Sequence, residues 1–493
     1  KFYKFNISKK GYGIILIPFL NNFVEILYKK YCDIEEKVKK NKHIKFQVLN
    51  SKDFVYFKNF EEFISFSQKD LFNFQIASEI INFNKYPNEK KIINHKFLKR
   101  IYLGFKQAVN TKIKDDYISE RITFKKKLKE IVNIYKLDFR YSNFLTGLLK
   151  YKIPPKQSLD KKNFSNINLY ITNQNRFLRS KILKIRSNNK IEKFIYSMVI
   201  KYLPSIYFES IKKNFITFDN KLSYVPKILI SNAHGWWTDD LFKYYSGFCM
   251  SNKSMYIDIQ HNGTYFIIKN NPHFEISKYF NNYFFGWGDA CRINKKNFKL
   301  PVLYSIGKNK KINNKASNYL KKNKIIFMGA SIKRFFGGYC QSYMDGGNSF
   351  SYYLNQLKFL NNISDDTIKK LILRLRHNEK DPRGYISYLK KKFKILKFED
   401  IKTPAAIRLK KKDVSIIIVD HCSTPWLEAL YCNKPMIIFW DNKENIINNR
   451  FLSIFSSLKK KKIYFDCPIA AAKRLEELIK KQNYDWWYKD TKI

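Results

Sequence analysis

Hydroxyl and acidic side chains follow an apolar run in the last quarter of the chain. The run Ile416–Val419 ends in Asp420, and a short helical pattern with Ser423, Thr424 and Glu428 comes next. Hydroxyl groups and free backbone N–H groups at a helix start can bind a phosphate, because the helix dipole favours an anion there. Glu428, one turn into the helix, would reach a ribose diol. The same pattern also fits an ordinary helix N-cap, so both interpretations stay open.

Two further apolar runs end in residues that suit phosphate binding. Arg374, Arg376 and His377 end one run, and strand alternation places the two arginines on one face. Buried arginines need a partner, which would be an anionic ligand or an acidic side chain elsewhere in the fold. Gly329 and Ser331 follow another run, in a turn whose N–H groups could cradle a phosphate. These residues are therefore predicted to bind a nucleotide.

Candidates for a general base lie earlier in the chain. His234, Asp239, Asp240 and His261 all follow predicted strands. A histidine can accept a proton near neutral pH, and a neighbouring carboxylate would orient it. The tryptophan pair next to His234 would suit stacking against a sugar, or could simply pack against the histidine. The two aspartates could equally serve the dipole of the next helix. We expect His234, Asp239 and His261 to be catalytic.

The cysteines and acidic residues do not form a metal or disulfide pattern. The seven cysteines are widely spaced and contain no CxxC pair, which disfavours a zinc site and a disulfide scaffold and favours a reducing cytoplasm. His421 and Cys422 are adjacent, and adjacent side chains rarely point at each other, so a Cys–His nucleophile is not expected. The pair Asp239 and Asp240 is too weak a signal for a metal site.

Apolar runs that alternate with helical patterns dominate the chain after about residue 220. Continuous apolar runs indicate parallel strands buried on both faces. The predicted strands of the first series are Lys227–Ser231, Ser254–Gln260, Tyr283–Trp287 and Pro301–Ile306. Those of the second are Ile325–Gly329, Leu371–Arg376, Lys394–Lys397, Val414–Asp420, Pro435–Trp440 and Lys462–Phe465, with helices at about 350–361, 383–392, 403–411, 424–432, 445–457 and 468–482.

These elements predict an α/β protein with two Rossmann-like, doubly wound domains. The N-terminal domain would span 1–312, with a helical part at 1–220 and a Rossmann-like core at 221–312. The nucleotide-binding domain would span 313–466, after a lysine-rich linker, and 467–493 would form a crossing helix. Two such domains facing across a cleft are the GT-B plan of glycosyltransferases. Ligands of such sheets bind at the carboxyl ends of the strands.

Basic residues far outnumber acidic ones in the chain. Lys and Arg number 94 against 41 Asp and Glu, a formal net charge of +53. The lysines are scattered rather than clustered, and the composition resembles a genome-wide bias, which counts against a nucleic-acid-binding protein. The charge favours nucleotide phosphates, acidic glycans or an anionic membrane surface. No signal peptide and no apolar stretch of about 20 residues is expected.

The segments described so far resemble a known family. D-x-x-S-T-x-x-x-E-A-L, from Asp420 to Leu430, with Pro435 after it, resembles the nucleotide-binding stretch of GT-B transferases and UDP-sugar epimerases. NAHGWWTDD, IQHNG, FFGWGD and the terminal DWW resemble putative transferases of bacterial O-antigen and surface-carbohydrate gene clusters. Asn262 stands where that family's turn suggests Gly, although Asn tolerates left-handed backbone angles. The resemblance implies a transferase class and leaves the substrate open.

The sequence thus predicts a metal-independent glycosyltransferase of surface-polysaccharide assembly at the cytoplasmic face of the membrane. It would need no cofactor and would use a nucleotide-sugar as donor and a glycan or lipid-linked glycan as acceptor. A peripheral contact with an anionic membrane is expected, and a nucleic-acid partner is not. The alternatives are a CDP-polyol phosphotransferase of the teichoic-acid type and a non-catalytic polyanion-binding or scaffold protein. Donor, acceptor, stereochemistry, oligomeric state and trimming of either end stay open.

Overall fold

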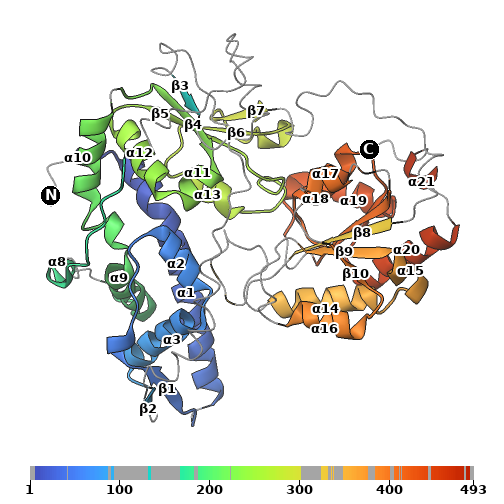
Figure 1. The fold of residues 1–493 in the computed structure, drawn as a ribbon, viewed down its shortest axis with the longest axis horizontal. Helices are drawn as coiled ribbons and strands as arrows, with labels where there is room; N and C mark the ends of the chain where they lie inside the picture. Colours follow the sequence, from blue (N-terminus) through green and yellow to red (C-terminus); the bar gives the residue numbers. More distant parts are fainter. Residues whose placement is uncertain are drawn as a thin grey trace.

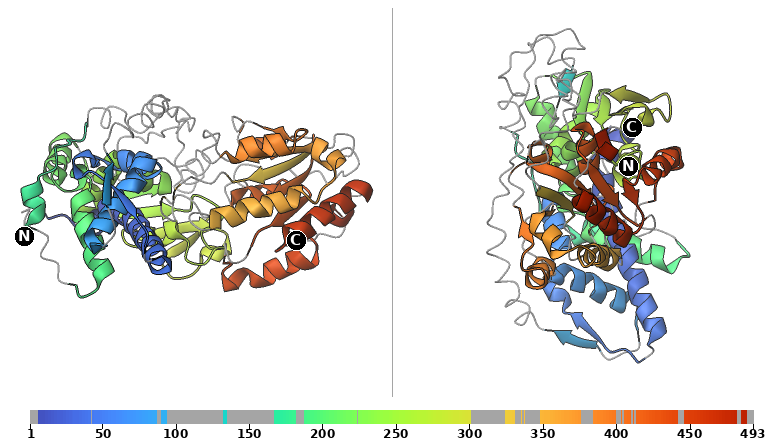
Figure 2. Two further views of the ribbon diagram at one scale, coloured as in Figure 1. Left: turned by 90° about the horizontal axis from the view of Figure 1, so that it is seen from below. Right: turned by 90° about the vertical axis from the view of Figure 1, so that its right-hand side faces the viewer.

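The computed structural model describes most of the chain outside a few long stretches. The described residues are 6–41, 43–86, 90–93, 132–134, 167–181, 187–222, 224–300, 324–330, 335, 337, 348–375, 384–399, 403, 405–409, 411, 413–441, 446–481 and 485–488. The predicted strand Pro301–Ile306 and most of the predicted linker lie outside them. Figures 1 and 2 show two lobes side by side, each with its own parallel sheet.

The second sheet, in the carboxy-terminal lobe, has six parallel strands. They are β8 (Lys324–Gly329), β9 (Leu371–Leu375), β10 (Lys397–Phe398), β11 (Val414–Val419), β12 (Met436–Phe439) and β13 (Tyr464–Phe465). Their order across the sheet is β10-β9-β8-β11-β12-β13. Counted along the chain this is 3-2-1-4-5-6, the order of a Rossmann-like sheet. The chain changes direction between β8 and β11, and this is the topological switch point.

Helices cover both faces of the second sheet. Ile416 and Ile418 of β11 belong to one apolar core, and Ile417 and Val419 belong to the other. This alternation explains why the strand is apolar from Ile416 to Val419. The first core includes α14 (Asn348–Leu360), α15 (Asp365–Lys370), α16 (Tyr385–Lys392) and α20 (Pro468–Lys481); the second includes α17 (Ala405–Leu409), α18 (Thr424–Tyr431), α19 (Leu452–Lys460) and α21 (Asp485–Tyr488).

The first sheet, in the other lobe, has five parallel strands in chain order. They are β3 (Val132–Ile134), β4 (Ile228–Asn232), β5 (Met255–Ile259), β6 (Tyr283–Trp287) and β7 (Asn297–Leu300). The strands β4, β5 and β6 were predicted, whereas the short β3 and β7 were not. The short helices that follow them are α11 (Ala233–Thr238), α12 (Asp240–Ser251), α13 (Pro272–Ser277) and η3 (Asp289–Cys291).

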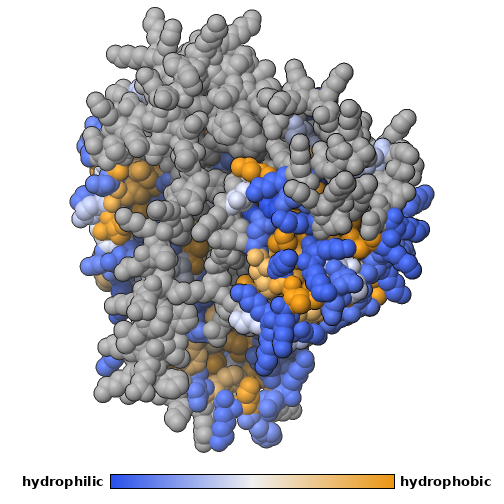
Figure 3. Space-filling model, turned by 45° about the vertical axis from the view of Figure 1, so that its right-hand side comes forward, coloured by the Kyte–Doolittle hydropathy of each residue, from blue (hydrophilic) through white to orange (hydrophobic). Residues whose placement is uncertain are grey.

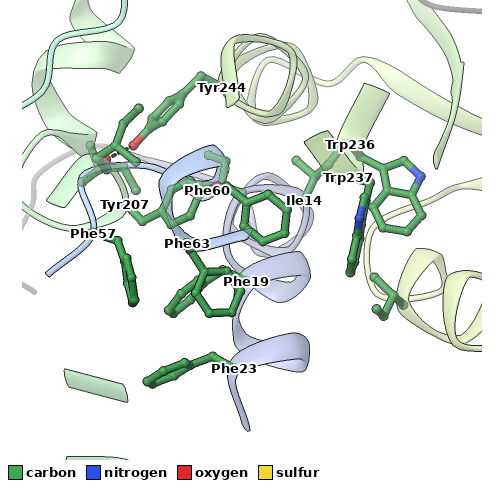
Figure 4. Close-up of a cluster of buried hydrophobic side chains, with 14 of the residues drawn as sticks. Ile14, Phe19, Phe23, Phe57, Phe60, Phe63, Tyr207, Trp236, Trp237 and Tyr244 are labelled. Carbon is green, nitrogen blue, oxygen red and sulfur yellow. Dashed lines mark hydrogen bonds between the residues drawn. The ribbon is translucent and has the colours of Figure 1, made fainter. Parts of the chain in front are cut away.

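A long helix, α1 (Lys9–Lys40), runs through this lobe and packs against α3 (Asp70–Asn84) and α9 (Lys190–Tyr202). The other described elements of the lobe are β1 (Phe46–Leu49), η1 (Ser51–Asp53), α2 (Phe60–Ser67), β2 (Lys90–Ile93), α8 (Arg176–Ser180), η2 (Ser205–Tyr207) and α10 (Ile211–Lys221). Phe19 of α1 packs against Phe63 of α2 (Figure 4), and their ring centroids are 5.0 Å apart. A Cβ on Gly11 would lie 2.8 Å from the Gly247 carbonyl oxygen, so glycine lets α1 touch α12.

The sequence predicted no apolar stretch long enough to cross a membrane, and helix α1 differs from that prediction. By length and composition it is the one helix among the described residues that could cross a membrane. More than half of its apolar stretch is buried inside the protein, as in the core helix of a globular lobe. On the face that Figure 3 shows, hydrophilic side chains dominate the described surface, and apolar ones lie among them as small patches.

Asp258 of β5 is a buried carboxyl group in the core of the first lobe. Its side chain is fully buried, and its Oδ1 accepts a hydrogen bond of 3.1 Å from Trp236 Nε1. Burial raises the pKa of Asp258 from 3.8 to about 8. Between these two pH values the folded protein holds a proton that the unfolded chain has released. The free energy of unfolding therefore falls as pH rises across this window.

We expect Asp258→Asn to remove this pH dependence. The amide keeps an acceptor for Trp236 and never ionises, so the variant should gain stability over the wild type as pH rises from 5 to 8. One pKa unit corresponds to about 1.4 kcal/mol, which suggests a gain on the order of 2–4 kcal/mol. Chemical unfolding at both pH values measures it. Asp366→Asn, at a side chain that is 84% exposed, is the control and should show no such gain.

Candidate functional site

A carboxylate–histidine pair occupies the loop after the central strand β11. His421 Nδ1 and Asp420 Oδ1 lie 2.8 Å apart, and both side chains are buried. Asp420 Oδ2 accepts hydrogen bonds from the Tyr352 hydroxyl at 2.8 Å and from Gln356 Nε2 at 2.5 Å. The Tyr352 oxygen also accepts a hydrogen bond of 2.7 Å from the Ala330 backbone N–H. One network therefore joins the ends of β8 and β11 across the switch point.

Gly329 makes room for this network. It is the last residue of β8, and a Cβ there would lie 2.8 Å from Gln356 Nε2 and 2.8 Å from Leu375 Cδ2. The sequence suggested that Gly329 frees backbone N–H groups for a phosphate. The structure gives it a packing role, because it lets α14 approach closely enough for Gln356 to reach Asp420.

Ser423 and Thr424 behave differently although both stand at the start of α18. Ser423 is the N-cap residue, but its Oγ makes no capping hydrogen bond. Within the described part of the chain this buried oxygen has no hydrogen-bond partner at all. Thr424 Oγ1 accepts a hydrogen bond of 3.2 Å from the Gly263 N–H of the other lobe. Of these two hydroxyls, that of Ser423 is the one open to a ligand or a water.

The loop after β5 connects the first lobe to the second lobe near the carboxyl end of β11. Besides the bond from Gly263 to Thr424, Ile268 forms an antiparallel bridge with Ile447. His261 stands two residues before Gly263 and is partly exposed. Asn262 Oδ1 accepts a hydrogen bond of 3.0 Å from the Thr264 N–H, and its backbone angle φ is not positive. Its side chain shapes the turn, rather than the left-handed backbone that we expected to replace Gly.

Glu428 lies on α18, one turn after Ser423 and Thr424, and is buried, with 8% of the residue exposed. Arg376, His377 and Ser331, the other predicted nucleotide-binding residues, lie outside the described residues. Their roles stay predictions.

Arg374 has the acidic partner that the sequence left open as an alternative. Its Nη1 lies 3.1 Å from Glu399 Oε1, and its Nη2 donates to the Thr403 carbonyl oxygen. Glu399 also accepts two hydrogen bonds, of 2.9 and 2.8 Å, from Nε of the buried Arg408. This ion cluster ties β9 to α17, so Arg374 stabilises the lobe and its guanidinium is engaged without a nucleotide.

The aspartates after β4 hold the fold together. Asp239 caps α12 by accepting a hydrogen bond of 3.0 Å from the Phe242 N–H. Asp240 accepts from the Tyr207 hydroxyl, and from Lys243 Nζ at 2.9 Å. Asp239 thus caps the helix, as one of its two interpretations proposed, and the catalytic role of Asp239 stays a prediction.

The aromatic residues next to His234 are part of the core. Trp236 and Trp237 are buried in the apolar cluster of the first lobe, so they do not offer the sugar-stacking surface that the sequence suggested. His234 lies on α11, directly after β4, and its side chain lies outside the description.

The thiol next to His421 is not a nucleophile. Cys422 is 1% exposed, and burial raises its pKa far above the ordinary thiol value. The sequence disfavoured a Cys–His nucleophile here, and the burial of Cys422 disfavours it as well. The partner of this histidine is the preceding residue, Asp420. Among the described residues no three His, Cys, Asp or Glu side chains come together to hold a metal ion.

A family model described as LIC12162 family transferase matches residues 1–492. No curated protein matches the chain.

We expect Glu399→Gln to lower stability and leave ligand binding unchanged. Removing this charge leaves the guanidinium groups of Arg374 and Arg408 buried without their shared carboxylate. Because Glu399 is partly exposed, the loss should be about 2–3 kcal/mol, below the range for fully buried pairs. The matched control is Glu275→Gln, which breaks an exposed pair with Lys278 and should cost less than about 1 kcal/mol. If Glu399→Gln has normal stability but no longer binds nucleotide, Arg374 would instead belong to the ligand site.

Proposed function

The chain belongs to the LIC12162 family of transferases, and on this premise we propose that it is a GT-B-type glycosyltransferase. It would move a sugar from a nucleotide-sugar to a glycan or lipid-linked glycan of a bacterial surface polysaccharide. The second lobe would bind the nucleotide, and the first would bind the acceptor. We place the reaction at the cytoplasmic face of the membrane, where the basic surface would favour anionic lipids and phosphates.

The observation that carries this proposal is the unpartnered Ser423 hydroxyl at the switch point of a Rossmann-like sheet. Ligands of such sheets bind where the strand order reverses, outside the carboxyl ends of the strands. The loop with His421 and Ser423 follows β11 at this position, and α18 begins directly after it, where the helix dipole favours an anion. Ser423 would donate its hydrogen bond to a donor phosphate, and Glu428 would accept from the ribose hydroxyls.

The acceptor hydroxyl would attack the anomeric carbon of the sugar while the bond from that carbon to the phosphate oxygen breaks. The electron pair of that bond leaves with the nucleotide, and a base takes the proton of the acceptor. We assign the base to the first lobe, with His261 as its first candidate, because its loop contacts Thr424 through Gly263. His234 is the second candidate, by its position after β4.

Thermal unfolding with CMP, CDP, UDP, GDP and ADP tests the nucleotide site. A ligand at 100 times its dissociation constant stabilises by about 2.7 kcal/mol, so one nucleotide should raise Tm by several degrees. Ser423→Ala should reduce this shift without destabilising the free protein, because its Oγ makes no hydrogen bond within the described chain. The matched control, Ser415→Ala, removes a bond of 3.1 Å to the Lys324 carbonyl at the opposite end of β11. It should lower Tm and keep the nucleotide shift.

Glu428→Ala should weaken nucleotide binding at least tenfold while the protein still folds. A ribose diol would lose its carboxylate acceptor, and hydrogen bonds to charged groups contribute about 1.5–3 kcal/mol. Isothermal titration with the stabilising nucleotide and with its 2′-deoxy analogue measures the effect, which should be smaller for the analogue. Unchanged affinity in the folded variant would remove Glu428 from the site. Turnover of CDP-glycerol but of no nucleotide-sugar would instead favour a polyol phosphotransferase.

A further inference from the structure

The edge strand of the first sheet carries an exposed surface that the proposed chemistry does not use. Strand β7 is the last strand of this sheet (Figure 1), and residues 292–296 lead into it from η3. All five of these residues are exposed, and so are Phe298 and Lys299 on β7 itself. They border an open hollow of about 630 Å³, whose lining includes Arg292, Ile293, Lys295, Asn297, Phe298 and Lys299. We call this region the β7 surface.

Basic side chains gather on the β7 surface with little acid to balance them. From η3 to β7 the chain has four basic residues and one acid, Asp289, which pairs with Lys299 at 2.7 Å. Lys295 and Lys296 have no acidic partner in the described part of the chain. Burial, and next to it the charge of Lys296, lowers the pKa of Lys10 at the start of α1. Like charges held this close repel each other, and an anionic partner would relieve the repulsion.

Large apolar side chains are exposed among these charges. Ile293 is 50% exposed and Phe298 is 45% exposed. The Phe298 ring lies 5.5 Å, between centroids, from each of the Tyr283 and Phe285 rings on β6, which are themselves only partly buried. Strand alternation puts these two rings on one face of β6, opposite Phe284, which is buried in the core. The outer face of the sheet edge is therefore an aromatic row that meets solvent.

This combination of charge and apolar exposure favours one kind of partner. Protein–protein interfaces are depleted in lysine, and a site for a small free anion needs no exposed apolar side chains. A bilayer with anionic lipids uses both. Lysine and arginine meet the headgroups, while aromatic and aliphatic side chains enter the interfacial layer.

The β7 surface also adjoins the contact between the two lobes. Arg450, in η6 (Asn449–Phe451) of the second lobe, donates a hydrogen bond of 3.1 Å to the Ala290 carbonyl oxygen in η3. Next to it, the Asn448 N–H donates to the Ile267 carbonyl oxygen at 2.8 Å, in the loop after β5 that also carries His261. A molecule held by the β7 surface would therefore keep this loop close to whatever holds it.

We propose that the β7 surface docks the protein onto a bilayer that contains anionic lipids. Its four basic side chains would bind the headgroup phosphates, and Ile293 and Phe298 would enter the interfacial layer between them. The role of this docking, which is to bring a lipid-linked acceptor within reach, rests on the proposed function.

Sedimentation of the full chain with lipid vesicles tests the proposal. We expect the wild type to bind vesicles of equal parts phosphatidylcholine and phosphatidylglycerol at least tenfold more tightly than phosphatidylcholine alone, with most of this gain lost at high salt. The double variant Lys295→Gln with Lys296→Gln should bind the mixed vesicles at least tenfold more weakly. A basic residue near an anionic surface contributes about fivefold, and this variant removes two.

Matched variants separate this surface from the net charge of the protein. Lys391→Gln with Lys392→Gln, at two exposed lysines of α16, removes the same charge from the second lobe and should bind as the wild type. Ile293→Ser should weaken binding severalfold even at high salt. Ile407→Ser, at an isoleucine of α17 that is 55% exposed, should not. All these side chains are exposed, so each variant should keep the Tm of the wild type.

Three results would overturn the inference. They are no binding of the wild type to the mixed vesicles, equal losses in the two double variants, and tighter binding of a single-stranded oligonucleotide that Lys295→Gln with Lys296→Gln abolishes. In each case the nucleotide shift in thermal unfolding is unaffected, so the proposed function is judged separately. If instead the vesicles bind as expected and no nucleotide does, the proposed function is overturned while the docking surface stands.

Discussion

The apolar packing on both faces of the second sheet is the constraint on which the rest of this lobe depends. Successive residues of β11 enter two different cores, so the strand interior has no room for an unpaired polar group. Arg374, on β9 of the same sheet, is tolerated because Glu399 neutralises it. Polar side chains that bind ligands can lie only where the strands end and backbone N–H groups become free. The loop with Asp420, His421 and Ser423 lies there.

The same constraint made the elements of the second lobe predictable. Uninterrupted apolar runs are a strong signal for buried parallel strands, and the longest helices between them, α14 and α20, are long enough to show their period. The helices expected at about 350–361 and 468–482 are observed at Asn348–Leu360 and Pro468–Lys481. In the first lobe, β3 and β7 have only three and four residues. They carry too few apolar positions for any period to appear.

Side-chain partners were not predictable, because periodicity shows which face a residue occupies but not what it meets there. Asp420 is 68 residues from Tyr352 and 64 from Gln356 in the chain. The one signal in the sequence was that Tyr352 and Gln356 are polar residues four apart on a helix that packs into the core. Arg374 illustrates the same limit, since its burial was foreseen and the identity of its acidic partner was not.

The two ends of β11 show what distinguishes a site from a well-packed sheet. Ser415, near the start of the strand, donates its hydroxyl to the Lys324 carbonyl, as folding stability demands. Ser423, after its end, buries a hydroxyl with no partner in the described chain, at a cost of about 1–3 kcal/mol. Most buried polar groups of natural proteins have hydrogen-bond partners, and the exceptions concentrate at functional sites, where a ligand can supply the partner. Three side chains of one network orient His421, two residues before that hydroxyl, so the loop combines a rigid side chain with a missing hydrogen bond. Packing explains the rigidity, and a bound ligand would explain the rigidity and the missing hydrogen bond together.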